Sequence, residues 1–177
     1  MNYFEFFGIP VSFRVDEAQL RRLFYQNSKK YHPDFHSLAS ADTQEEMLRL
    51  STLNNEAFQT LSDPDRRMRY LLEIKGLLQE EGQQQVPQDF LAEMMDINEV
   101  LLELELDYDP ERFEQTAQAI AQLERALDEA IEPVLERYAD DAEHSREDLL
   151  RVRDYFLKKR YLLRVREKLS TFAAQSG

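Results

Sequence analysis

The sequence predicts an all-α protein, and three observations support this fold class. Only 4 Gly and 6 Pro occur among 177 residues, too few for the many turns of an all-β domain. Between them lie long stretches rich in Leu, Glu, Gln, Arg, Lys and Ala, the good helix formers. No segment shows the sustained apolar and polar alternation, rich in Val, Ile and Thr, that is typical of strands.

The first 76 residues are expected to form four helical segments, at 3–7, 16–32, about 43–61 and 66–75. Gly8 ends the first of these, and Pro33 ends the second because the residue before a proline avoids the α region. Asp63 and Pro64 separate the third from the fourth. Two medium helices flanked by two short ones predict a compact unit over residues 1–76.

The remaining sequence predicts a linker and a second domain. Residues 77–88 are rich in Gln and Gly and have the composition of a linker. Residues 89–177 contain three helical patterns, over about 89–106, 111–138 and 146–172. Three helices with short connections predict an antiparallel three-helix bundle.

Charge divides at the same boundary. The chain carries 22 Lys and Arg against 35 Asp and Glu, a net charge of −13. Residues 1–76 have ten bases and eleven acids (net −1), whereas residues 77–177 have twelve and twenty-four (net −12). Residues 18–32 contain four bases and no acid, and residues 89–111 contain nine acids and no base. These segments predict two docking surfaces of opposite charge.

Composition also excludes several classes of function. Without Cys there is no disulfide, thiolate metal site, cysteine nucleophile or self-held iron–sulfur cluster. No apolar run is long enough to span a bilayer, and the first residues lack the basic start of a secretory signal, so a cytoplasmic protein is expected. The net charge argues against binding to nucleic acid or to an anionic membrane. No nucleophile–base pair, phosphate loop or cofactor motif suggests an enzyme.

One tripeptide after the basic helix stands out as a recognition site. Pro33 fixes φ near −65° and so presents His32 and Asp34 stiffly. The imidazole can donate and accept hydrogen bonds, and the carboxylate can take a bidentate Arg. The preceding helix supplies cations that steer an acidic partner toward the loop: Arg21, Arg22, Lys29 and Lys30.

His-Pro-Asp between two helices, the first of them basic, resembles the J-domain of DnaJ-type co-chaperones. The flanking segments are also similar to that family: residues 3–10 to its opening, 55–64 to its third helix and 66–70 to its fourth. The resemblance implies that this loop engages a DnaK-type ATPase chaperone and stimulates its ATP hydrolysis. J-domains usually continue with Lys after the tripeptide, whereas Phe35 and His36 follow here.

The tripeptide has two other interpretations. The tripeptide could merely end a helix, although the flanking matches make that the minor interpretation. His32 and His36 stand at the i, i+4 spacing of a metal-binding helix. Pro33 prevents a regular helical turn there and no third ligand lies nearby, so no metal site is expected.

The helix predicted over residues 89–106 carries two apolar stripes. One has the spacing of a bundle core, at Phe90, Met94, Ile97, Leu101 and Leu104. The other, Leu91, Met95 and Leu102, is interleaved with Asp96, Glu99 and Glu103. The second stripe is either part of a wide buried face or a binding surface for a partner with an apolar patch and a basic rim.

A J-domain followed directly by a three-helix bundle resembles the HscB family of iron–sulfur co-chaperones. Residues 90–99 are similar to that family's helix that binds the cluster scaffold IscU, with Asn98 in place of a usual Arg and Ala92 in place of a larger Met. The resemblance implies scaffold contacts at Leu91, Ala92, Met95, Asp96, Glu99 and Glu103, and at a final-helix aromatic, Phe156.

The resemblance implies an adaptor that delivers a scaffold carrying its cluster to an HscA-type ATPase. The alternative is a J-domain co-chaperone of a general DnaK-type chaperone with a different client. Binding of nucleic acid through the bases of the last helix is disfavoured by the net charge. Those bases are Arg151, Arg153, Lys158, Lys159 and Arg160.

Overall fold

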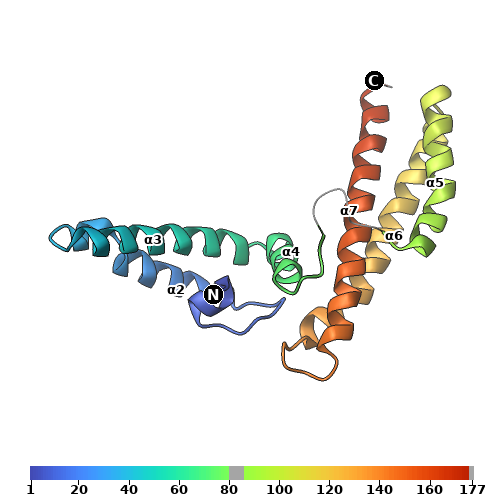
Figure 1. The fold of residues 1–177 in the computed structure, drawn as a ribbon. Helices are drawn as coiled ribbons and strands as arrows, with labels where there is room; N and C mark the ends of the chain where they lie inside the picture. The colour runs from blue at the N-terminus through green and yellow to red at the C-terminus, as the bar shows by residue number, and fades with distance from the viewer. Residues whose placement is uncertain (80–85, 176–177) are drawn as a thin grey trace. The chain divides into compact units, whose positions relative to one another are not determined.

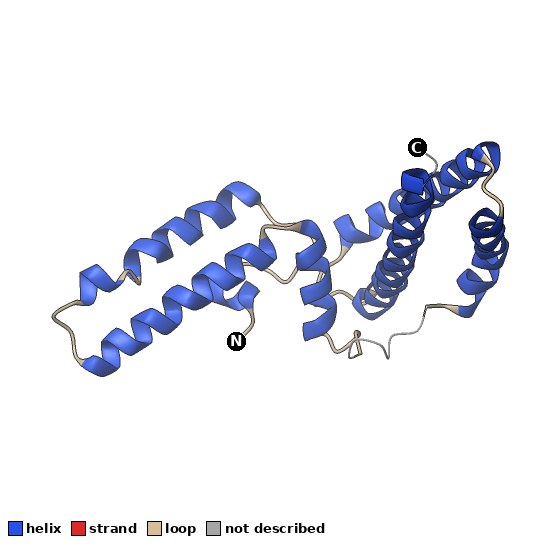
Figure 2. Cartoon of the chain, turned by 90° about the horizontal axis from the view of Figure 1, so that it is seen from above, coloured by secondary structure: helices blue, strands red, loops and turns tan. Residues whose placement is uncertain are grey.

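The structure of the chain is a computed structural model that describes residues 1–79 and 86–175. The described residues form helices and loops without any strand, which confirms the all-α prediction (Figure 2). Contacts divide the chain into two compact units. One comprises Met1–Gly76 with Tyr138–Ser145, and the other Leu77–Arg137 with Arg146–Gly177. Of the expected linker, residues 80–85 lie outside the described residues.

The first unit is built on a helical hairpin. Its elements are α1 (Tyr3–Phe7), α2 (Glu17–Lys30), the short 3₁₀ helix η1 (Pro33–His36), α3 (Ala41–Leu61) and α4 (Pro64–Ile74) (Figure 1). The helix starts follow capping rules: the carboxylate of Asp16 accepts from the Gln19 N–H, and that of Asp63 caps α4 just before its first residue, Pro64. At the end of α1, Gly8 adopts φ 67°, the left-handed conformation that glycine favours.

Apolar side chains from all four α-helices of the first unit meet in its core. Phe24 of α2 stacks on Phe58 of α3 with 4.2 Å between ring centroids, and Tyr3 of α1 stacks on Tyr70 of α4 at 4.4 Å. Fully buried members of this core include Phe4, Leu20, Ala57, Leu61, Leu71 and Leu72. The hairpin is therefore anchored at the end where α1 and α4 pack.

A connection from later in the chain also belongs to the first unit. Tyr138 is 4% exposed and its ring lies 5.0 Å from that of Phe13. The Tyr138 hydroxyl donates to Asp140 over 2.7 Å, and Lys75 forms an ion pair with the same carboxylate. No local sequence pattern indicated these contacts, which join residues more than sixty positions apart.

The second unit is a bundle of α5 (Gln88–Leu106), α6 (Pro110–Arg137) and α7 (Ser145–Gln175), drawn side by side in Figure 1. The predicted bounds of these helices differ from the observed ones by three residues or fewer. All three contribute to one core, which includes Met94 and Leu101 of α5, Ile120 of α6 and Leu162 of α7. Ion pairs between Arg166 and Glu124 and between Lys159 and Asp128 connect α7 to α6.

Candidate functional site

The His-Pro-Asp tripeptide begins the loop formed by residues 31–40, called the hairpin loop here, at the free end of α2 and α3. His32 is the N-cap of η1, and Pro33 is its first residue. The side chains of His32 and Asp34 are 52% and 88% exposed. Neither side chain is used in the core of the first unit, so both are available to a partner.

Short-range hydrogen bonds fix the shape of the hairpin loop. The backbone N–H of Asp34 donates to Nδ1 of His32 over 3.2 Å, and the Phe35 N–H donates to the His32 carbonyl over 3.1 Å. With Nδ1 occupied as an acceptor, the neutral His32 ring carries its proton on Nε2. The carboxylate of Asp34 lies 3.7 Å from Nδ1, close enough to pair with the ring when it is protonated.

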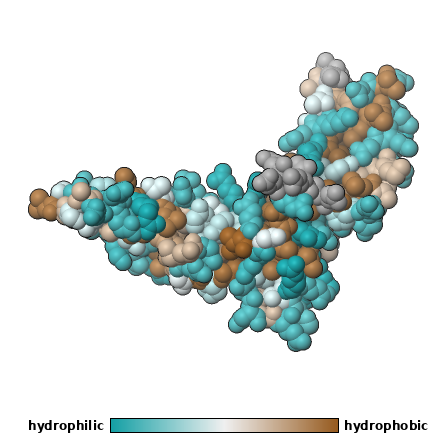
Figure 3. Space-filling view, viewed as in Figure 1, coloured by the Kyte–Doolittle hydropathy of each residue, from teal (hydrophilic) through white to brown (hydrophobic). Residues whose placement is uncertain are grey.

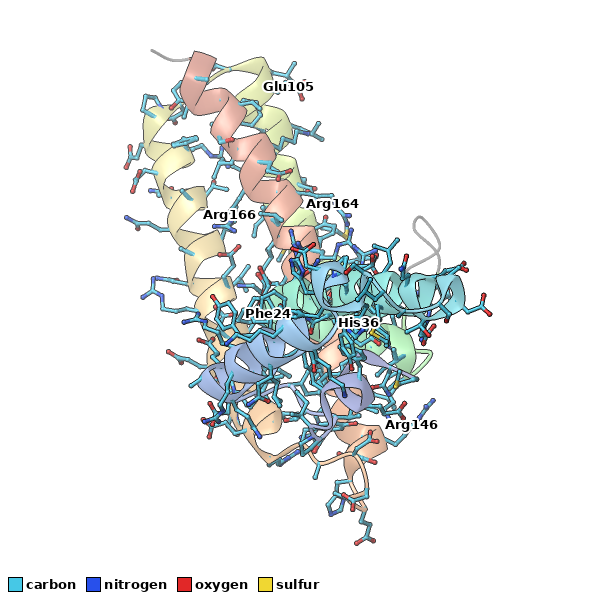
Figure 4. The ribbon with its side chains drawn as sticks, turned by 90° about the vertical axis from the view of Figure 1, so that its left-hand side faces the viewer. Phe24, His36, Glu105, Arg146, Arg164 and Arg166 are labelled. Carbon is cyan, nitrogen blue, oxygen red and sulfur yellow. The ribbon has the colours of Figure 1, made fainter. Side chains whose placement is uncertain are left out.

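His36 holds the loop against α2. Its Nε2 donates to the carbonyl of Lys30 over 2.8 Å, and Figure 4 shows it at the hairpin loop, with Phe24 on the neighbouring helix. This bond gives His36 a structural role in the hairpin loop. Across the described residues, no group of three or more His, Asp or Glu side chains could hold a metal ion.

The four cations expected to steer a partner all lie on α2 and are exposed: Arg21, Arg22, Lys29 and Lys30. Arg22 and Lys29 are seven residues apart and so share one face of the helix. Lys29 and Lys30 occupy the last turn, where they also complement the negative end of the helix dipole. Lys30 lies 5.5 Å from the Tyr31 ring centroid, next to the tripeptide. The basic face of α2 is therefore continuous with the hairpin loop.

The second candidate site is the outer face of α5. Its inner face is buried, with Phe90, Met94, Leu101 and Leu104 no more than 3% exposed. The other stripe, called the α5 stripe here, is open: Leu91 is 40% exposed, Met95 62% and Leu102 57%. Leu106, 89% exposed, extends it by one turn. Figure 3 shows this as hydrophobic surface interrupting the hydrophilic face along α5.

Small and acidic residues border the α5 stripe. Ala92, Asp96, Glu99 and Glu103 are all exposed. Only Glu103 has a described ion pair among them, at 2.6 Å to Arg112 of α6. The face therefore combines apolar area with negative charge, which suits a partner that has an apolar patch and a basic rim.

Tyr161 of α7 packs against α5, although it was not among the predicted site residues. Its ring meets Phe90 edge to face at 5.6 Å, and its hydroxyl accepts a 2.8 Å hydrogen bond from Asn98. Lys158 lies 5.6 Å from the Phe90 ring centroid, so Lys158 and Tyr161 mark the side of α7 that faces α5.

Phe156 is half-buried, and its ring lies 5.5 Å from the Arg160 guanidinium on its own helix. At 100° per residue, Phe156 is rotated roughly 200° from Lys158 and 140° from Tyr161 around α7. Phe156 and Tyr161 therefore lie on different faces of α7. The sequence does contain a signal for the packing of Tyr161: it lies next to Leu162 and four residues before Val165, both of which belong to the bundle core.

No helix in residues 1–79 or 86–175 is both long and apolar enough to cross a bilayer.

Comparisons with known proteins assign both parts of the chain. A family model described as "DnaJ domain" matches residues 2–70. Another, "HSCB C-terminal oligomerisation domain", matches residues 86–170.

Proteins with similar sequences are named as HscB co-chaperones, in agreement with both family models. The human "Iron-sulfur cluster co-chaperone protein HscB" is 31% identical over 169 residues, which cover 95% of this chain and 67% of that protein. A "Co-chaperone protein HscB homolog" of Vibrio cholerae serotype O1 is 39% identical over 112 residues. That match spans 66% of the Vibrio protein, slightly less than two thirds of its length.

Two solved structures have the same fold. "Chaperone HscB from Vibrio cholerae" aligns with a TM-score of 0.59 and 26% identity over 99% of both chains. Human HscB aligns with a TM-score of 0.64 and 27% identity over 97% of this chain and 81% of the human one. The N-terminal part is thus a J-domain, and the chain belongs to the HscB family of co-chaperones.

Proposed function

We propose that this chain is an adaptor for iron–sulfur protein maturation. Its α5 stripe binds an IscU-type scaffold carrying its cluster, and its hairpin loop docks on an HscA/DnaK-type ATPase chaperone and stimulates ATP hydrolysis. Residues 1–76 and 89–177 act as the two functional domains, joined by residues 77–88. The cluster is cargo of the scaffold, and the adaptor needs no cofactor of its own.

One observation carries this proposal: two exposed surfaces of opposite charge lie on separate units, and neither is used in a core. His32 and Asp34 are exposed beside the basic end of α2. Leu91 and Met95 are exposed among the carboxylates of α5. An acidic chaperone surface and an apolar, basic scaffold surface can therefore be held at the same time.

The mechanism is linkage between two binding events. An adaptor that holds the scaffold and the ATPase together raises their effective concentration with respect to one another. Docking of the hairpin loop accelerates hydrolysis, and the chaperone then closes on the scaffold that the adaptor has delivered. By reciprocity, any gain in chaperone affinity caused by the scaffold equals the gain in scaffold affinity caused by the chaperone.

The scaffold part is tested by calorimetric titration of the chain with an IscU-type scaffold. Leu91→Ala combined with Met95→Ala removes the apolar area in the N-terminal half of the α5 stripe. We expect the affinity to fall by about tenfold or more, since each truncated side chain contributes on the order of 1 kcal/mol. Stimulation of the chaperone ATPase by the adaptor alone should be unchanged.

Two further variants sharpen this test. Tyr161→Ala should also weaken scaffold binding, because the ring supports Phe90 beneath the stripe. Phe156→Ala should weaken it as well, because the family resemblance implies a scaffold contact at this half-buried aromatic side chain. Equal affinity of the double variant and the wild type would contradict the scaffold site. It would then favour a J-domain co-chaperone of a general chaperone with another client.

A further inference from the structure

Two large apolar side chains in the hairpin loop project into solvent. Phe35 is 72% exposed and Leu38 is 100% exposed. Apart from Met1, the other exposed large apolar residues described in the first unit lie on helices, such as Tyr25 and Leu48, each 59% exposed. Figure 3 shows hydrophobic surface at the free end of the hairpin, where α2 and α3 are joined.

The part of the hairpin loop that carries Leu38 is held by hydrogen bonds. The Ala39 N–H donates to the His36 carbonyl over 3.0 Å. The side-chain amide of Gln44, on α3, donates to the carbonyls of Ser37 and Ala39, both at 3.1 Å. These carbonyls flank Leu38 on both sides, so the backbone that carries it is fixed to α3. Folding of the first unit therefore leaves Leu38 outside the core.

The two side chains are continuous with the tripeptide. The Phe35 ring lies 6.0 Å from the His32 ring in an edge-to-face arrangement. Leu38 follows Phe35 by three residues, two positions beyond the end of η1, so both apolar side chains belong to the same short loop. A polar residue would satisfy the fold equally well at either position, because neither side chain fills internal space.

We propose that Phe35 and Leu38 form an apolar contact with the ATPase chaperone, next to the contact made by His32 and Asp34. This inference rests on the proposed function and specifies the partner. The partner is then a chaperone with a hydrophobic surface facing Phe35 and Leu38. The contact makes part of the docking energy insensitive to salt, whereas the part contributed by α2 cations is screened.

A second copy of the chain is the other occupant to consider, and area argues against it. A buried Phe removes roughly 150–250 Å² from water, and a stable protein interface needs about 1,200 Å² in total. Two side chains at a loop tip fall well short of that area. They suffice to add affinity to an interface that the tripeptide and α2 already provide.

The test titrates the adaptor into the HscA-type or the DnaK-type chaperone of the source organism and measures the stimulation of steady-state ATP hydrolysis. Each titration is done at about 0.05 and 0.5 M salt. We expect Phe35→Ser to raise the adaptor concentration that gives half-maximal stimulation of the cognate chaperone by about tenfold. Leu38→Ser should raise it by about threefold or more. Both losses should persist at the higher salt. Phe35→Lys should bind no better than Phe35→Ser at the higher salt, because a lysine cannot replace an apolar contact.

Leu48→Ser is the matched control, an exposed apolar residue of the same unit outside the loop, and it should behave as the wild type. Circular dichroism melts confirm that each variant is folded. Wild-type half-maximal concentrations for both loop variants would overturn the inference, as would a dimer in sedimentation that Phe35→Ser dissociates without changing ATPase stimulation. Loss of all stimulation in His32→Gln, alongside wild-type behaviour of the loop variants, would leave the proposed function standing.

Discussion

Arg67 is a charged residue that is buried in the first unit. An arginine in a short amphipathic helix is normally solvated, yet Arg67 is 3% exposed. Its Nε donates to the Phe13 carbonyl over 2.8 Å and its NH1 to the Leu61 carbonyl over 2.6 Å. Burial lowers the pKa of the guanidinium. The side chain joins α4, the end of α3 and the segment before α2.

We expect Arg67→Met to lower the free energy of unfolding by about 2–4 kcal/mol, because two backbone carbonyls lose their donor in a buried place. Urea unfolding followed by circular dichroism measures the change. Arg66→Met alters an exposed neighbour and should stay within about 0.5 kcal/mol of the wild type. Equal stability of the two variants would show that Arg67 does not hold the unit together.

Residue-level prediction succeeded where the local chain determines the geometry. Pro33 dictates the break after α2, so the exposed positions of His32 and Asp34 followed from the sequence. Prediction was weaker for the aromatic residues of α7. The family resemblance implies Phe156, whose contact with a scaffold stays a prediction, whereas the packing of Tyr161 on Phe90 of α5 was not predicted. A motif carries no information on which face a bundle buries.

At the scale of elements, the hydrophobic period predicted the α-helices and the inner face of α5. Phe90, Met94, Leu101 and Leu104 form the buried stripe that their spacing indicated. The period could not decide whether the second stripe of α5 is covered, since that depends on how many helices pack around it. It could not reveal the packing of Tyr138 on Phe13 either, because contacts distant in sequence leave no local pattern.

The segment Tyr138–Ser145 gives the first unit a pH-dependent link. Burial acts to raise the pKa of Asp140, but hydrogen bonds from Lys75 and Tyr138, with the charge of Lys75, outweigh it and hold the pKa below its ordinary 3.8. A carboxyl whose pKa is depressed by folding contributes stability above its unfolded pKa. That contribution is lost as the pH falls through the folded value.

We therefore expect Asp140→Asn to cost about 0.5–1 kcal/mol of unfolding free energy at neutral pH, a modest figure because the pair is partly solvated. The difference between variant and wild type should shrink as the pH falls below about 4. Urea titrations at neutral and acid pH measure both values. A difference that stays constant with pH would contradict the assigned link.

At the scale of the whole molecule, charge and composition predicted a boundary near residue 76. The N-terminal 76 residues are nearly neutral with a basic α2, and the remainder carries a net charge of −12 with an acidic α5. The two compact units meet between Gly76 and Leu77 in the chain, as the composition change suggests. Linkage of a J-domain to an acidic, apolar bundle face is what an adaptor between an ATPase and a client requires.

The most direct test of the account is steady-state ATP hydrolysis by the partner chaperone with wild-type chain and with His32→Gln. The account predicts that the wild type accelerates hydrolysis, more so when the scaffold is present, and that His32→Gln removes the acceleration while its helical spectrum and its scaffold affinity are retained. Undiminished acceleration by a correctly folded His32→Gln chain would contradict the account.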